Sequence, residues 1–134
     1  EDAFNFYKSV FGGEFGYMGR FKDMPSPEKG GLPFPEEEGD RIMHVSLPIS
    51  KETTIMGSDT GGEWGARYKQ GNNITISITA YSKEEADRLF NALAKGGNIT
   101  MPLQNTFWGD YFGTLVDQFG INWMMSYNEA RPKN

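Results

Sequence analysis

The sequence predicts an α+β fold in which two βαβββ units follow one another along the chain. Three observations lead to this prediction: an amphipathic helical pattern occurs twice, a Gly-Gly pair ends it each time, and three extended segments follow each pair. The units are expected at about 1–60 and 72–128, within a single domain that covers residues 1–134.

Apolar residues at spacings of three and four mark the two helices. The first stripe consists of Ala3, Phe4, Tyr7, Val10 and Phe11. It predicts a helix over 3–11 that ends at Gly12-Gly13, because glycine adopts the positive φ of a helix terminus. The second stripe consists of Ala86, Leu89, Phe90, Leu93 and Ala94. Ser82 and Glu85 form a capping box before it, and the helix is expected over 83–95.

Extended segments complete each unit. In the first unit they are 14–21, 41–49 and 53–59, and in the second 98–103, 108–118 and 121–128. A further strand over 73–81 precedes the second helix. By symmetry a strand should also precede the first helix, and this strand is absent from the sequence.

The long segment 22–40 separates the first two strands of the first unit and is rich in Pro, Gly and acidic residues. This composition predicts an exposed loop. Its acidic run, Glu36–Glu38, is interpreted as a solvated surface, with ligand binding as the less favoured alternative. The Gly-rich segments 29–31 and 60–65 are also expected in loops, with no helix after them.

Composition excludes several classes of function. A net charge of -5 with scattered Lys and Arg argues against binding to nucleic acid. The absence of Cys excludes disulfides and thiolate chemistry. No apolar run approaches the ~20 residues of a membrane span, and no signal peptide is visible. We therefore expect a cytoplasmic protein that binds neither nucleic acid nor membrane.

Alternation along the strands predicts which side chains share a face. In the strand over 41–49, Met43, Val45, Leu47 and Ile49 form an apolar face. Ile42, His44 and Ser46 are then expected on the opposite face. In the later strands, Thr75, Ser77 and Thr79 face away from the packed isoleucines, and Asn122, Met124 and Ser126 face away from Trp123 and Met125. These polar rows are either binding surfaces or ordinary solvated faces.

Three phrases extend this interpretation: FYKSVFGGEF at 6–15, DRIMHVSL at 40–47 and MPLQNTFWGDYFGTLVDQFGINWMM at 101–125. The chain resembles the vicinal oxygen chelate superfamily of glyoxalases, extradiol dioxygenases and bleomycin resistance proteins. Within it, the phrases are similar to the PhnB-like, or 3-demethylubiquinone methyltransferase-like, branch. The resemblance implies a curved mixed sheet with a concave cleft, and a homodimer.

The resemblance also implies where metal ligands would lie. Three of the four ligand positions correspond to Met56, Thr75 and Met124, and the fourth falls on the absent strand. None of the three is a His or a carboxylate, which divalent metals of the glyoxalase type require. We therefore expect no metal site and no cofactor.

The candidate site residues are those expected on the cleft side. His44 is the candidate catalytic residue, since histidine exchanges protons near neutral pH, although a lone His on a strand is more often only hydrogen-bonded. Trp108 either stacks on a flat ligand or caps the interior, and Asp110 either binds ligand or stabilises a turn. Asp117 and Gly120 are interpreted as turn residues. The candidate ligand-binding residues are Ser46, Met56, Ser58, Thr75, Ser77, Trp108, Asp110 and Met124.

Three functions remain open at this point. The first is a metal-independent binder of a small hydrophobic or aromatic molecule, for which the thioether and aromatic content of the candidate residues is suited. The second is a glyoxalase-like lyase or isomerase that uses His44 as acid or base, with or without a metal. The third is a dimer whose cleft no longer has a function. A methyltransferase receives no support, because no strand, Gly-rich turn and helix are expected in succession.

Overall fold

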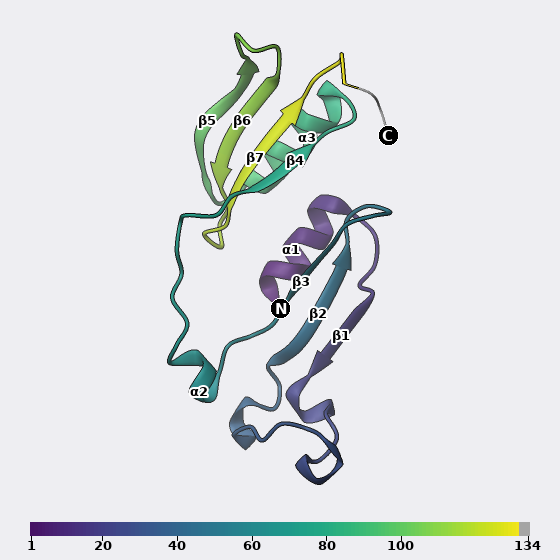
Figure 1. Cartoon of the computed structure of the whole chain (residues 1–134), viewed down its shortest axis with the longest axis vertical. Coiled ribbons are helices and arrows are strands. Elements are labelled where there is room, and N and C mark those ends of the chain that lie inside the picture. The colour runs from purple at the N-terminus through teal and green to yellow at the C-terminus, as the bar shows by residue number, and fades with distance from the viewer. Residues whose placement is uncertain (132–134) are drawn as a thin grey trace. The chain divides into compact units, whose positions relative to one another are not determined.

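The computed structural model describes residues 1–131, apart from the side chain of Trp64. The chain divides into two compact units, Glu1–Gln70 and Gly71–Asn134. Each unit contains one long helix and one sheet, as the elements in Figure 1 show. The α+β class and the repeated order of helix and three strands are confirmed.

The first unit contains α1 (Asp2–Phe11) and a sheet of three antiparallel strands. The strands are β1 (Tyr17–Arg20), β2 (Ile42–Pro48) and β3 (Thr54–Gly57), with β2 in the centre. Helix α1 ends one residue before Gly12, whose φ of 76° is the conformation expected of a helix-terminating glycine. Its Phe4 ring lies against Gly57 of β3, where an added Cβ would come within 2.5 Å of the ring.

The predicted faces of β2 require one correction. Ile42 was expected on the same face as His44 and Ser46, but it is 1% exposed and lies with Val45 and Leu47 on the face toward α1. The register between β1 and β2 shifts after Gly19. Gly19 pairs with His44, whereas the next residue, Arg20, pairs with Ile42. Met43 is therefore an extra residue in β2, and such a bulge reverses the alternation beyond it. His44 and Ser46 keep the face that the alternation predicted.

The segment between β1 and β2 contains three short 3-10 helices, at Phe21–Asp23, Pro27–Lys29 and Glu36–Glu38. The acidic run is only partly a solvated surface, because the Glu38 carboxylate accepts the backbone N–H of Gly62 at 3.0 Å. Gly62 begins the four-residue helix α2 (Gly62–Gly65), within a segment that was predicted to lack a helix. The carboxylate of Glu38 thus accepts a hydrogen bond from the first backbone N–H of this short helix.

The second unit contains β4 (Ile76–Thr79), α3 (Lys83–Ala94), β5 (Asn98–Asn105), β6 (Tyr111–Val116) and β7 (Asn122–Tyr127). Its four-stranded sheet has the order β4-β7-β6-β5, in which β4 and β7 are parallel and the other pairs antiparallel. Strand β4 begins at Ile76, so that Ile74, which was predicted in the strand, precedes it and is 76% exposed.

Helix α3 packs on one face of this sheet. Its buried residues Ala86, Leu89, Phe90 and Leu93 are those of the predicted stripe. The Ser82 hydroxyl accepts the N–H of Glu85 at 3.0 Å, and the Glu85 carboxylate accepts the N–H of Tyr81 at 2.7 Å. Gly113 of β6 leaves room for the helix, because a Cβ there would lie 3.0 Å from the Phe90 ring.

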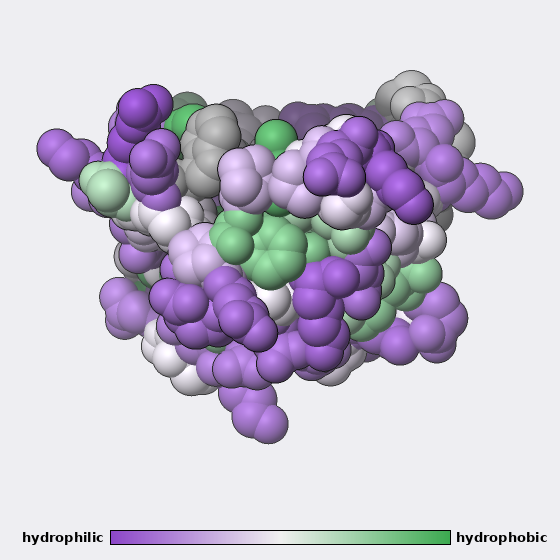
Figure 2. All heavy atoms as spheres, turned by 90° about the horizontal axis from the view of Figure 1, so that it is seen from below, coloured by the Kyte–Doolittle hydropathy of each residue, from purple (hydrophilic) through white to green (hydrophobic). Residues whose placement is uncertain are grey.

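Hydrophilic side chains dominate the face of the molecule drawn in Figure 2, and smaller hydrophobic areas lie between them. Among residues 1–131, the structure contains no helix with both the length and the apolar character that a membrane crossing requires.

Candidate functional site

The face of the three-stranded sheet opposite α1 brings together candidate residues from different strands. Ser46 of β2 pairs with Tyr17 of β1 on one side and with Met56 of β3 on the other. His44 lies two residues from Ser46 and therefore projects from the same face. We call this surface the first open face, and it consists of Tyr17, Gly19, His44, Ser46 and Met56.

Tyr17 belongs to this face although the sequence analysis did not select it. Its ring lies over Gly19, where an added Cβ would come within 2.2 Å of the tyrosine Oη. Gly19 is the cross-strand partner of His44, and the centroids of the Tyr17 and His44 rings are 6.0 Å apart with an interplanar angle of 32°. The signal in the sequence was the glycine two residues after Tyr17, which frees space on the face that both residues share.

The face of the four-stranded sheet opposite α3 brings together the candidates of the second unit. Ser77 of β4 pairs with Met124 of β7, and Met124 pairs with Thr114 of β6. The Thr114 hydroxyl is 2.6 Å from that of Thr100, which extends the row to β5. We call this surface the second open face; it consists of Ser77, Thr79, Thr100, Phe112, Thr114, Met124 and Ser126, with Trp108 above Phe112.

Trp108 lies in the turn between β5 and β6 and reaches back to the second open face. Its ring centroid is 5.9 Å from that of Phe112, with an interplanar angle of 67°. Trp108 is 52% exposed, so about half of its surface is accessible to another molecule. The preceding Phe107 is 98% exposed and contacts Trp108 edge to face at 5.0 Å.

Asp110 is a buried anchor at the end of this turn. Its carboxylate accepts the side-chain amide of Asn128 at 2.7 Å and the guanidinium of Arg131 at 3.2 Å. Its backbone carbonyl accepts both the N–H and the hydroxyl of Thr106. Asp110 is only 7% exposed, and these bonds agree with the second of its two predicted roles, the stabilisation of a turn.

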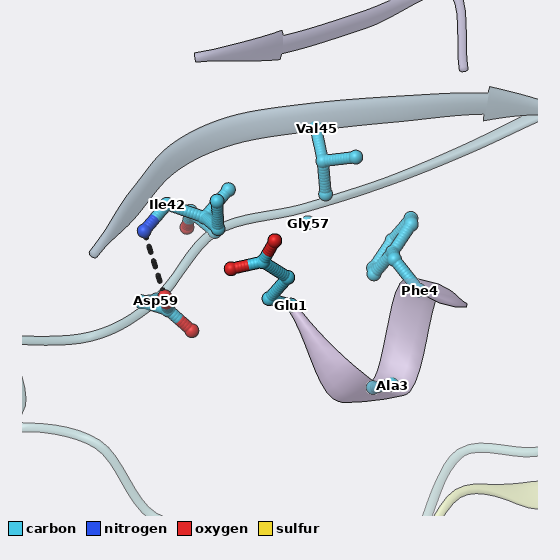
Figure 3. Close-up of a pocket in the computed structure, with 8 residues that line it drawn as sticks. Glu1, Ala3, Phe4, Ile42, Val45, Gly57 and Asp59 are labelled. Carbon is cyan, nitrogen blue, oxygen red and sulfur yellow. Dashed lines mark hydrogen bonds between the residues drawn. The ribbon is translucent and has the colours of Figure 1, made fainter. Parts of the chain in front are cut away.

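Two candidate residues lie apart from these rows. Thr75 precedes β4 and is exposed. Ser58 follows β3 and lines a pocket of about 120 Å³ between α1 and the sheet, with Glu1, Ala3, Phe4, Ile42, Val45, Gly57 and Asp59. Figure 3 shows this pocket, in which Val45 and Phe4 face each other and Asp59 accepts the N–H of Ile42 at 2.7 Å.

This pocket does not fit the predicted ligand. Sites for drug-sized molecules have volumes of about 300–1,000 Å³, so a volume near 120 Å³ is too small. The Glu1 carboxylate at its edge accepts the Arg20 guanidinium at 2.9 and 3.0 Å. These bonds raise the pKa of Arg20 above its ordinary value. We interpret the pocket as a packing space on the helix side of the sheet.

The residues at the implied metal-ligand positions carry no conventional ligand atoms. Met56 and Met124 offer thioethers and Thr75 a hydroxyl. Among residues 1–131, no group of three or more His, Asp or Glu side chains lies close enough together to hold a metal ion. His44 has the Tyr17 ring as its described neighbour on the first open face.

The fold and the sequence together define the class of protein. The family model of the glyoxalase/bleomycin resistance protein/dioxygenase superfamily matches residues 1–125. The chain belongs to this superfamily, as the resemblance in its sequence implied.

Individual relatives agree with this assignment. The Escherichia coli K12 protein YjdN is 31% identical over 138 residues, which cover 98% of this chain and 89% of YjdN. The crystal structure of protein PA1353 from Pseudomonas aeruginosa has 37% identity and a TM-score of 0.78, covering 96% of this chain and 88% of PA1353. The PhnB protein from Bacillus cereus has 25% identity and a TM-score of 0.70, covering 94% of this chain and 88% of PhnB.

Proposed function

We propose that this member of the superfamily binds a small hydrophobic or aromatic molecule without the help of a metal ion. Each of the two open faces is, by itself, a surface that we assign to such a ligand. The observation on which the proposal depends is the position of Trp108, which is half exposed and rests on Phe112 at the edge of the second open face.

The chemistry of the second open face supports an apolar or aromatic ligand. An indole supplies a large flat contact area, and the thioether of Met124 adapts to ligands of irregular shape. The hydroxyls of Ser77, Thr114 and Thr100 supply hydrogen-bond groups beside these apolar surfaces. A few polar groups within a mainly apolar surface are typical of small-molecule sites.

A titration with 2-naphthol, followed by isothermal calorimetry, tests this proposal. We expect saturable binding that Trp108→Ala weakens about fivefold to tenfold, the effect of losing one aromatic contact. Tyr68→Ala is the matched control, because Tyr68 is 58% exposed and belongs to neither open face. The proposal fails if 2-naphthol gives no saturable heat, or if the Trp108 variant binds as tightly as the control.

A lyase or isomerase of the glyoxalase type is the second candidate. The observation that favours it is the place of His44 on the first open face, beside the phenol of Tyr17. A histidine that reaches a ligand surface is able to act as general acid or base. Stoichiometric metal binding that depends on His44 would favour the metal-assisted form of this candidate over the binding function.

The methyltransferase label of the PhnB-like branch gains little from the short helix α2. This helix follows β3 and the glycines 61–62, but it has four residues, and its first N–H donates to Glu38. Cofactor phosphates are bound at the free N-terminal amides of longer helices. In this chain the Glu38 carboxylate lies where a phosphate would bind.

A further inference from the structure

We infer that the ligand of the first open face is a neutral aromatic molecule with a hydroxyl group, and that Tyr17 and His44 are the residues that recognise the hydroxyl. This inference rests on the proposed function and names the class of its ligand. It assigns a binding role to Tyr17, which the sequence analysis had not selected.

The Tyr17 ring has an orientation that Gly19 makes possible. A tyrosine on a strand ordinarily stands away from the sheet, but the absence of a side chain at Gly19 lets this ring lie along the strand. A Cβ added at Gly19 would lie 2.2 Å from Oη, 2.7 Å from Cζ and 2.9 Å from Cε1 of Tyr17. The hydroxyl end of the ring therefore covers Gly19. Because Gly19 pairs with His44, the phenol oxygen lies beside the strand position from which the imidazole projects.

The Tyr17 and His44 rings together form one surface. Their centroids are 6.0 Å apart and their planes differ by 32°, so they form a shallow aromatic surface. The Ser46 hydroxyl lies next to Tyr17 in the register, and the 64% exposed Met56 follows Ser46. A flat ring is able to contact the aromatic surface and the thioether, while its hydroxyl both donates and accepts hydrogen bonds.

Charge decides between neutral and ionic ligands. The residues of the first open face are Tyr17, Gly19, His44, Ser46 and Met56, and none of them carries a fixed charge. The nearest basic strand residue, Arg20, lies on the other face and binds Glu1. A carboxylate ligand would lose its hydration here without gaining a cation, which makes its binding unfavourable.

Three probes that share one ring system test the inference: 2-naphthol, naphthalene and 2-naphthoate. The chain has one histidine, so its imidazole Cε1 resonance in an NMR spectrum belongs to His44 without further assignment. We expect 2-naphthol to shift this resonance and to bind about tenfold more tightly than naphthalene, from one or two hydrogen bonds. We expect 2-naphthoate to bind more weakly than naphthalene.

Substitutions in the first open face test which residues cause the preference for 2-naphthol. Tyr17→Phe and His44→Leu should each reduce the preference for 2-naphthol over naphthalene to about twofold or less, since each removes a hydrogen-bond partner. Gly19→Ala should have the same effect, because its Cβ would lie 2.2 Å from the Tyr17 Oη and therefore displaces the ring. Tyr68→Phe should leave the preference unchanged. Binding of all three probes with equal affinity, or a preference that survives these variants, would overturn the inference while leaving the proposed function intact. Failure of every probe to bind would overturn both.

Discussion

The carboxylate of Asp117 accepts the indole N–H of Trp123 at 2.8 Å, and both side chains are buried, with exposures of 3% and 2%. The same carboxylate accepts the backbone N–H groups of Phe119 and Ile121, at 2.8 and 3.1 Å. Asp117 therefore closes the turn between β6 and β7 and satisfies the polar atom of the largest core residue of the second unit. Trp123 is a packing residue on the α3 side of β7.

This relationship predicts a large loss of stability on Asp117→Ala. The substitution leaves the buried indole N–H and two turn amides without their acceptor, and we expect the free energy of unfolding to fall by about 3 kcal/mol. Asp117→Asn keeps one acceptor oxygen and should cost about 1 kcal/mol. Urea denaturation measures both. Glu28→Gln, at an exposed position, is the control, and an Asp117→Ala protein as stable as this control would contradict the prediction.

Tyr111 predicts a loss of stability at high pH. Its hydroxyl donates to the Asp87 carboxylate, and this bond, with burial and the charge of Asp87, raises the pKa of Tyr111 to about 12 from an ordinary value of 10. The folded chain thus holds the phenol proton more tightly than the unfolded chain. The stabilising contribution is complete below pH 10 and is lost as the pH rises to about 12.

Tyr111→Phe should remove this pH dependence. The Lys83 ammonium lies 4.6 Å from the Tyr111 ring centroid and also contributes to stability there, so the wild type must be compared with the variant at each pH. Thermal unfolding between pH 9 and pH 12 measures the difference. If the two proteins lose stability in parallel over this range, the hydrogen bond to Asp87 is not the cause of the loss of stability.

Much of the fold was predictable from local pattern. The two helices were predicted to within a residue at each end, because each has a strong stripe and a glycine at its end. The turn roles of Asp117 and Gly120 also followed from residue type, and Gly120 has the positive φ of 83° that such a turn requires.

The features that the sequence did not predict depend on contacts that a single sequence does not display. The place of Ile42 depends on a bulge at Met43, which only the pairing with β1 defines. The place of Ser58 depends on where β3 ends, at Gly57. The role of Asp110 depends on Asn128 and Arg131, which lie 18 and 21 positions away in the sequence. In each case a contact between distant segments decides the outcome.

The candidate metal positions predict the result of elemental analysis. Thioethers and a hydroxyl at Met56, Met124 and Thr75 are poor ligands for Zn²⁺, Ni²⁺, Mn²⁺ and Fe²⁺. We expect no stoichiometric metal in the purified protein and unchanged ligand binding after treatment with a chelator. About one equivalent of metal per chain, removed by chelator and lost on His44→Ala, would instead support the lyase.

A homodimer is the expected assembly. Strand β5 is an edge of the four-stranded sheet, and seven of its eight residues are exposed, with Leu103 half-buried. Open edges with unpaired backbone groups favour association with another chain. Light scattering at tens of micromolar should give about twice the chain mass of 15.1 kDa, and a mass equal to that of one chain would argue against the dimer.

The two adjacent methionines of β7 provide the most direct test of the central claim, that the open faces bind a small aromatic molecule. Met124 lies on the second open face, whereas Met125 is 1% exposed and lies on the face covered by α3. In a spectrum of ¹³C-methyl-labelled methionine, saturating 2-naphthol should shift the methyl resonance of Met124 and leave that of Met125 nearly unchanged. A ligand that shifts Met125 while Met124 stays in place, or that shifts neither, would contradict the claim.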